Sequence, residues 1–255
     1  MTTVKFEIDG QVGIVTMAKP PHNLIDDAFL FDLIEAYRKV VADGARSILL
    51  RSDMRHFCAG AEIQTFGTTT RFHVEREKFD RIMDGLENVP VPTVAALNGG
   101  VLGGGLELAL TCDMIIAADT TFLGQVEVAA GVHPLLGGTQ RLVQRAGLVR
   151  AKEISMLGRR HTPETFERWG IINLVVPEAE LATAALTWAR QLAAGPTKIL
   201  NGIKTIANEA ARYGTAAADK QQIAVSEMVF ATEDCKRGLD AFAKTGPGTA
   251  VYRGN

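Results

Sequence analysis

The stretch Asn98-Gly99-Gly100-Val101-Leu102-Gly103-Gly104-Gly105-Leu106-Glu107-Leu108-Ala109 sets a carboxylate close behind three glycines. Val94–Leu97, just before it, is typical of a buried strand. Glycine at a strand-to-helix turn lets the backbone approach a ligand closely, and the helix that follows directs free N–H groups at that spot. An oxygen that gains negative charge there would be stabilised. By spacing alone, close packing of a helix on a strand is the simpler interpretation.

A second glutamate, Glu127, follows twenty residues after Glu107, within Gln125-Val126-Glu127-Val128-Ala129-Ala130. A buried carboxylate is costly unless it is protonated, hydrogen-bonded or in use. Taken singly, Glu107 is explained as an acid near a helix N-terminus, and Glu127 as a surface acid on a strand or turn. As a pair beside a glycine turn, they favour proton-transfer chemistry, because different environments push paired pKa values apart.

A loop of small residues, Phe57-Cys58-Ala59-Gly60-Ala61-Glu62, follows the strand predicted at Ser47–Ser52. Such a loop can present a backbone N–H to a ligand. Together with the glycine turn it would supply two donors to one oxygen, which is the arrangement of an oxyanion hole. An ordinary connecting loop is the alternative, and without further information it is the better one.

Composition excludes several other classes of function. The 255 residues are 47% hydrophobic with a net charge of −2, so neither nucleic acid nor an anionic membrane is indicated as a partner. Three distant cysteines indicate neither a disulfide framework nor a metal site, and the histidines lack metal-ligand spacing. The N-terminus lacks the apolar core of a secretory signal, so a reducing cytoplasm is the expected location.

Residues 89–106 carry no charge, but two prolines and five glycines favour a strand, turn and helix start over a membrane span.

Strands and helices alternate in the first part of the chain, and helices alone follow. Val4–Ile8 and Val12–Met17 are predicted to form a hairpin around Asp9-Gly10. No convincing strand follows Val176. Further strands are predicted at Met114–Ala118 and Leu174–Val176. Two helices are predicted to start at Asp26 and Thr162. The other predicted helices are Arg71–Glu87, Gly138–Ala146, Arg150–Leu157, Glu178–Ala194, Pro196–Arg212 and Thr215–Ala231. The prediction is a mixed α/β core, residues 1–195, and a helical region, residues 196–255, too small for a core of its own.

Five segments resemble the crotonase (enoyl-CoA hydratase/isomerase) superfamily, and most closely enoyl-CoA hydratase. They are Phe57–Ile63, Asn98–Ala109, Cys112–Ala117, Phe122–Glu127 and Gly137–Leu142. The resemblance implies an α/β spiral of ββα units that carries an acyl-CoA site. It also implies that the C-terminal helices assist oligomerisation into trimers, often paired into hexamers.

The same resemblance assigns roles to individual residues. The backbone N–H groups of Ala61 and Gly104 would form the oxyanion hole, and Glu107 and Glu127 would be the acid/base pair that hydrates a trans-2-enoyl-CoA. Glu127 would protonate C2 and Glu107 would activate the water. No metal and no cofactor apart from the coenzyme A of the substrate are implied. Substrate contacts are expected at Ala59, Glu62, Ile63, Leu102, Gly103, Pro134 and Leu135.

Some positions depart from the family pattern. Glu62 replaces an aspartate, Val126 a proline, and Leu135-Leu136 a pair of small residues whose replacement would crowd the acyl end. Lys19 and Lys244 are the candidates for contacts to coenzyme A phosphates. The alternatives are an enoyl-CoA isomerase, a non-catalytic acyl-CoA-binding scaffold and, more distantly, a nicotinamide oxidoreductase, whose glycine fingerprint is missing.

Overall fold

A six-stranded sheet forms the centre of the protein, whose computed structural model describes residues 2–62 and 75–255. The strand order is β1-β2-β3-β4-β6-β8. Only the β1–β2 pair is antiparallel, which confirms the predicted hairpin. The strands are β1 (Val4–Asp9), β2 (Val12–Met17), β3 (Ser47–Ser52), β4 (Thr93–Leu97), β6 (Met114–Ala118) and β8 (Leu174–Val176).

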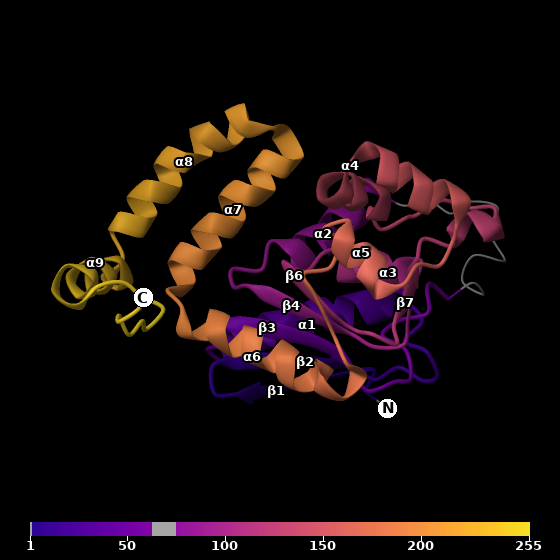
Figure 1. Ribbon diagram of the computed structural model, residues 1–255, viewed down its shortest axis with the longest axis horizontal. Coiled ribbons are helices and arrows are strands. Elements are labelled where there is room, and N and C mark those ends of the chain that lie inside the picture. Colours follow the sequence, from indigo (N-terminus) through magenta and orange to yellow (C-terminus); the bar gives the residue numbers. More distant parts are fainter. Residues whose placement is uncertain (1, 63–74) are drawn as a thin grey trace.

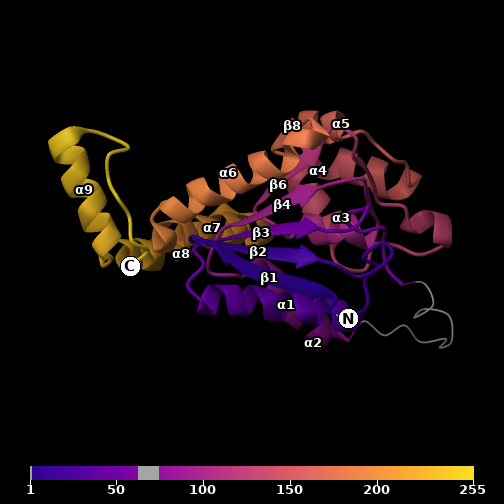
Figure 2. The ribbon, with the colours of Figure 1, turned by 90° about the horizontal axis from the view of Figure 1, so that it is seen from below.

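Helices cover both faces of this sheet, as is usual for parallel strands. Helices α1 (Asp27–Ala42) and α2 (Arg76–Glu87) lie on one side and α6 (Leu181–Ala194) on the other (Figure 2). Alternate residues of β4 serve the two cores: Ala95 and Leu97 face the α1 side, whereas Val94 and Ala96 face α6. All five residues of β4 are therefore buried.

A second, two-stranded parallel sheet pairs β5 (Gly100–Leu102) with β7 (Phe122–Gly124). Each short strand follows a strand of the main sheet and precedes a helix: β4-β5-α3 (Gly104–Ala109), then β6-β7-η2 (Glu127–Ala130), where η2 is a 3-10 helix. This repetition is the predicted spiral of ββα units. Sequence analysis missed β5 and β7, because three-residue strands containing glycine resemble turns.

Most predicted helices are confirmed. Helix α4 (Gly138–Leu157) is interrupted at Gly147, where φ is 79° and ψ 166°, so its two halves match the two helices predicted there. Helix α5 (Pro163–Arg168) begins with the predicted proline, and η3 (Glu178–Glu180) leads into α6. Residues 71–74 of the helix predicted from Arg71 lie outside the described residues. The uncharged stretch 89–106 contains β4, β5 and the start of α3, and no described helix is both long and apolar enough to cross a membrane.

The C-terminal helical region extends away from the sheet (Figure 1). It comprises α7 (Thr197–Tyr213), α8 (Thr215–Phe230) and α9 (Glu233–Thr245), and α9 lies at the opposite end of the molecule from α3 (Figure 1). Arg46 joins this region to the core, because its guanidinium donates to the Gly195 carbonyl at 2.5 Å and to Thr197 Oγ1 at 2.8 Å. The division at residue 195 and a role in oligomerisation stay predictions.

Candidate active site

The turn between β5 and α3 depends on Gly103, whose φ of 53° and ψ of −123° are disfavoured for residues with a side chain. Its N–H donates to the Gly124 carbonyl at 2.9 Å, which ties the turn to β7. Its carbonyl accepts from Leu106 and Glu107 and so starts α3. Every residue of α3 is buried, so Glu107 is carried into the interior on a rigid support.

The two predicted oxyanion donors lie side by side. Ile25 bridges the loop before α1 to the loop around Ala61: its N–H donates to Gly60 and its carbonyl accepts from Glu62, each at 2.9 Å. In this parallel pattern the N–H of Ala61 faces away from Ile25. A methyl group built on Gly104 would lie 3.8 Å from the Ala61 nitrogen. Gly104, the first residue of α3, therefore lies beside Ala61, and the first N–H groups of an α-helix have no partner within the helix.

Glu107 is 2% exposed and is held by three backbone N–H groups. Its Oε1 accepts from Leu136 at 2.7 Å and Gly138 at 2.8 Å, and its Oε2 accepts from Leu135 at 3.2 Å. Burial raises the pKa of Glu107 above its ordinary value, and these donors and the nearby Arg141 offset that rise only in part. The donors surround the carboxylate at the N-terminus of α4, where negative charge is favoured.

Glu127, the first residue of η2, is half-buried. Burial, with a smaller contribution from the charge of Glu107, raises the pKa of Glu127 to about 7. The Gln125 side chain is fully buried beside it. With its amide nitrogen turned toward Glu127, Gln125 donates to the two carboxylate oxygens at 2.7 and 2.9 Å. The two glutamates thus differ in environment: one is enclosed by main-chain donors and the other is partly open.

Both glutamates and both candidate donors line one cavity of about 610 Å3. Of the expected substrate contacts, Ala59, Gly103 and Leu135 also line it, whereas Glu62, Leu102 and Pro134 do not. Ile63 lies outside the described residues. Leu135 and Leu136 form part of the wall and leave the cavity open. The apolar part of the lining also includes Ile25, Leu30, Phe79, Ile82 and Val132.

Other candidates have structural environments. Burial raises the pKa of the Cys58 thiol to about 12 and that of Cys112 to about 11, so neither is an activated nucleophile. Lys19 binds Asp26 at 2.6 Å, and Lys244 lies on the distant α9, 3.6 Å from Asp240. Within residues 2–62 and 75–255, no cluster of three acidic, histidine or cysteine side chains is arranged to hold a metal.

Comparison with known proteins identifies the family. The model of the enoyl-CoA hydratase/isomerase family matches residues 7–249. The chain belongs to this family. A probable enoyl-CoA hydratase from Rhizobium meliloti is 31% identical over 242 residues, which are 94% of each chain. The mitochondrial enoyl-CoA hydratase domain-containing protein 2 of Mus musculus is 33% identical over 244 residues, which are 89% of this chain and 80% of the mouse protein.

Solved structures share the fold over the whole chain. Enoyl-CoA hydratase subunit I from Geobacillus kaustophilus superposes with a TM-score of 0.92 at 32% identity, over 99% of this chain and 98% of that one. An enoyl-CoA hydratase from Bacillus anthracis superposes with a TM-score of 0.86 at 27% identity, over 99% of this chain and 100% of that one. The crotonase resemblance and the fold predicted from it are thereby confirmed for this member of the enoyl-CoA hydratase/isomerase family.

Sequence analysis missed some groups of this family member's site. Gln125 supports Glu127, and the N–H groups of Leu136 and Gly138 hold Glu107. Gln125 lies two positions before Glu127, but the direction in which its side chain points depends on the preceding short strand β7. That strand was not predicted from the sequence. Backbone donors carry no signature of their own in a sequence. The family motif Gly137–Leu142 marked the segment without assigning it a task.

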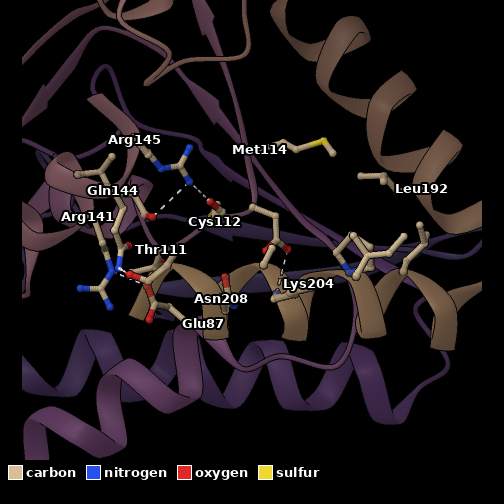
Figure 3. Close-up of a pocket in the computed structure, with 17 residues that line it drawn as sticks. Glu87, Thr111, Cys112, Met114, Arg141, Gln144, Arg145, Leu192, Lys204 and Asn208 are labelled. Atoms are coloured by element: carbon tan, nitrogen blue, oxygen red, sulfur yellow. Dashed lines mark hydrogen bonds and ion pairs between the residues drawn. The ribbon is translucent and has the colours of Figure 1, made fainter. Parts of the chain in front are cut away.

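A second cavity, of about 390 Å3, is lined by residues of α4, such as Arg141 and Arg145, and of α7, such as Lys204 and Asn208 (Figure 3). Its charged side chains form ion pairs: Lys204 binds Asp113 at 2.9 Å, and Glu87 binds both Arg141 and Arg212. Arg145 donates to the carbonyl of Cys112 at 2.5 Å, at the end of the segment that follows α3. Among the described residues, none of the site residues expected from the sequence lines this second cavity.

Proposed function

We propose that the protein is an enoyl-CoA hydratase that adds water across the 2,3 double bond of a trans-2-enoyl-CoA. The observation that carries this proposal is the meeting of Glu107, Glu127, Ala61 and Gly104 at one cavity. Its volume of about 610 Å3 falls within the range of pockets that enclose small organic ligands. The mostly apolar wall suits an acyl chain.

In the proposed reaction the thioester oxygen accepts hydrogen bonds from the N–H groups of Ala61 and Gly104. Glu107, whose carboxylate form is favoured by its three donors, takes a proton from water as the water oxygen bonds to C3. The electrons of the double bond move toward the thioester oxygen, and the resulting enolate is stabilised by the two N–H groups. Glu127, which keeps its proton up to about pH 7, delivers that proton to C2.

This mechanism needs no metal and no redox cofactor, since both protons and the hydroxyl come from water and the glutamates. The substrate contacts expected at Ala59, Gly103 and Leu135 are consistent with it, because these residues line the same cavity. We also propose that the protein works as a trimer or a pair of trimers. Exposed apolar side chains on α7, α8 and α9 support this assembly; they include Ile203, Ile223, Phe230, Leu239 and Phe242.

Loss of the enoyl absorbance of crotonyl-CoA and of longer trans-2-enoyl-CoA thioesters tests the proposal. Absorbance should fall with wild-type protein and remain with the Glu107→Gln, Glu127→Gln double variant. Conversion of 3-enoyl to 2-enoyl thioesters without hydration at any chain length would replace the proposal by an isomerase. Tight binding of these thioesters without turnover of either kind would replace it by a non-catalytic scaffold.

A further inference from the structure

We propose that Arg141 is a positioning residue for Glu107, and that it acts through the peptide group joining Gly137 to Gly138. This inference rests on the proposed hydratase function. Arg141 lines the second cavity and not the one that holds the glutamates, so it would not touch the substrate. Its influence passes through the main chain.

The connecting peptide is hydrogen-bonded at both ends, and its Gly137 carbonyl also accepts from the main-chain N–H of Arg141 at 3.3 Å. The Arg141 side chain donates from Nη1 to the Gly137 carbonyl at 3.0 Å. The N–H of the same peptide, that of Gly138, donates to Glu107 Oε1 at 2.8 Å. Hydrogen bonds in series polarise one another in a medium of low dielectric constant. The guanidinium charge therefore strengthens the N–H that holds the carboxylate.

Glycine on both sides of this peptide lets the main chain come close to the carboxylate. A methyl group on Gly138 would lie 2.7 Å from Glu107 Cγ and 2.3 Å from the Gln125 amide oxygen, which faces Gly138 once the amide nitrogen is turned toward Glu127. Contacts this short do not occur between real atoms, so the main chain reaches the carboxylate only because the residue is glycine. A rotation of the peptide would take its N–H away from Glu107.

Arg141 is itself oriented by Glu87 at the end of α2, through an ion pair shown in Figure 3. The two side chains are only 12% and 14% exposed. The other oxygen of Glu87 accepts from Arg212 of α7 at 2.8 Å. A continuous chain of polar contacts thus runs from α7 of the C-terminal region through Glu87, Arg141 and one peptide to Glu107.

The charged groups that face Glu107 are Glu127, from η2, and Arg141, from α4. Arg141 lowers the pKa of Glu107 against the effect of burial. Glu127 acts in the opposite sense, since like charges disfavour each other. Without Arg141, the pKa of Glu107 should rise and less of the water-activating carboxylate should be present at low pH.

The first test compares Arg141→Gln with Arg212→Gln in steady-state hydration of crotonyl-CoA between pH 5 and 9. Arg212→Gln is the matched control, because it removes an arginine from the same glutamate but leaves Gly137 untouched. For Arg141→Gln we expect kcat to fall on the order of 10- to 100-fold with KM changed less than about threefold, because positioning and not binding is lost. The low-pH limb of its profile should move to higher pH.

Arg141→Lys should recover part of the rate, since it keeps the charge, and Arg212→Gln should stay within about twofold of wild type because its bond to Glu87 is at the surface. Equal profiles for Arg141→Gln and Arg212→Gln would overturn the inference. So would a loss of rate that disappears when activity is expressed per folded molecule.

A second test does not depend on turnover. The carboxyl carbon of Glu107, labelled with 13C and assigned with Glu107→Gln, reports its own titration by NMR. The pKa of Glu107 should be higher in Arg141→Gln than in wild type and unchanged in Arg212→Gln. An unchanged pKa in Arg141→Gln would overturn the inference even if the protein proved not to be a hydratase. A shift in a protein without hydratase activity would uphold the link from Arg141 to Glu107 and overturn only the proposed function.

Discussion

The two cavities of this protein use the same acidic side chains in opposite ways. In the larger cavity, Glu107 and Glu127 are held by main-chain N–H groups and a neutral amide, and burial raises the pKa of both. In the smaller cavity, Asp113 and Glu87 are held by lysine and arginine. The first pair of carboxylates is therefore bonded to neutral donors, whereas each carboxylate of the second pair is bonded to a cation.

The difference distinguishes carboxylates suited to catalysis from carboxylates that stabilise the fold. Carboxylates that are not bonded to a cation are suited to give and take protons. Carboxylates with a cation are suited to join elements that are distant in sequence, as Lys204 of α7 and Asp113 do. Each of the following changes either removes this contrast or measures it.

Replacing one proposed catalytic acid should have the largest effect. Glu107→Gln and Glu127→Gln should each lower kcat for crotonyl-CoA by about 100- to 10,000-fold, because an amide cannot exchange the proton. Binding of the thioester, measured by calorimetry, should change little. A single variant that retains more than a tenth of the wild-type rate would contradict the assignment.

Replacing an acid of the smaller cavity should affect stability and not chemistry. Asp113 accepts from the N–H of Thr93 at 2.8 Å, from its hydroxyl at 3.0 Å and from Lys204. Asp113→Ala leaves these donors without an acceptor and should lower the free energy of unfolding by about 2–3 kcal/mol. Denaturant titration measures this, and kcat per folded molecule should stay near the wild-type value. A large loss of kcat in fully folded protein would contradict the distinction between the two cavities, because Asp113 would then contribute to catalysis.

The raised pKa of Glu127 predicts a dependence of stability on pH. Its unfolded value is near 4.5 and its folded value about 7, so the folded state binds the proton more tightly. Glu127 therefore lowers the free energy of unfolding progressively as pH rises from about 4.5 to 7. Above that range the decrease is constant. Because glutamine stays neutral, Glu127→Gln should have a higher Tm than wild type at pH 8 and nearly the same Tm at pH 4. A difference independent of pH would show that Glu127 has an ordinary pKa.

An exposed ion pair should matter least, even one that lines the larger cavity. Lys78 binds Asp27 at 2.7 Å, and the two side chains are 32% and 61% exposed. Lys78→Met should change the free energy of unfolding by less than about 1 kcal/mol, because solvent and salt screen such pairs. Denaturant titration at low and high salt tests this, with Asp113→Ala as the internal reference. An effect as large as that of Asp113→Ala would mean that position in the cavity matters more than exposure.

Much of the main sheet was predictable because its strands are apolar runs bounded by turn residues. The hairpin at Asp9-Gly10 and the helix start at Asp26 have local causes, and both are found. Strands β5 and β7 were not predictable, since each is stabilised by pairing with the other, as Gly100 does with Phe122. The start of α9 at Glu233 also escaped prediction. Of the substrate contacts expected from the family, Glu62, Leu102 and Pro134 lie outside the cavity wall, and their role stays a prediction.

The sequence by itself determined the family and most of the elements in their order, and it singled out the two glutamates that we propose as catalytic, because these depend on residue types at fixed spacing. Tertiary structure alone decided what each glutamate meets. The N–H groups of Leu135, Leu136 and Gly138 reach Glu107 across about thirty positions of the chain. Main-chain donors are the same in every residue, so the direction in which each one points exists only once the chain has folded.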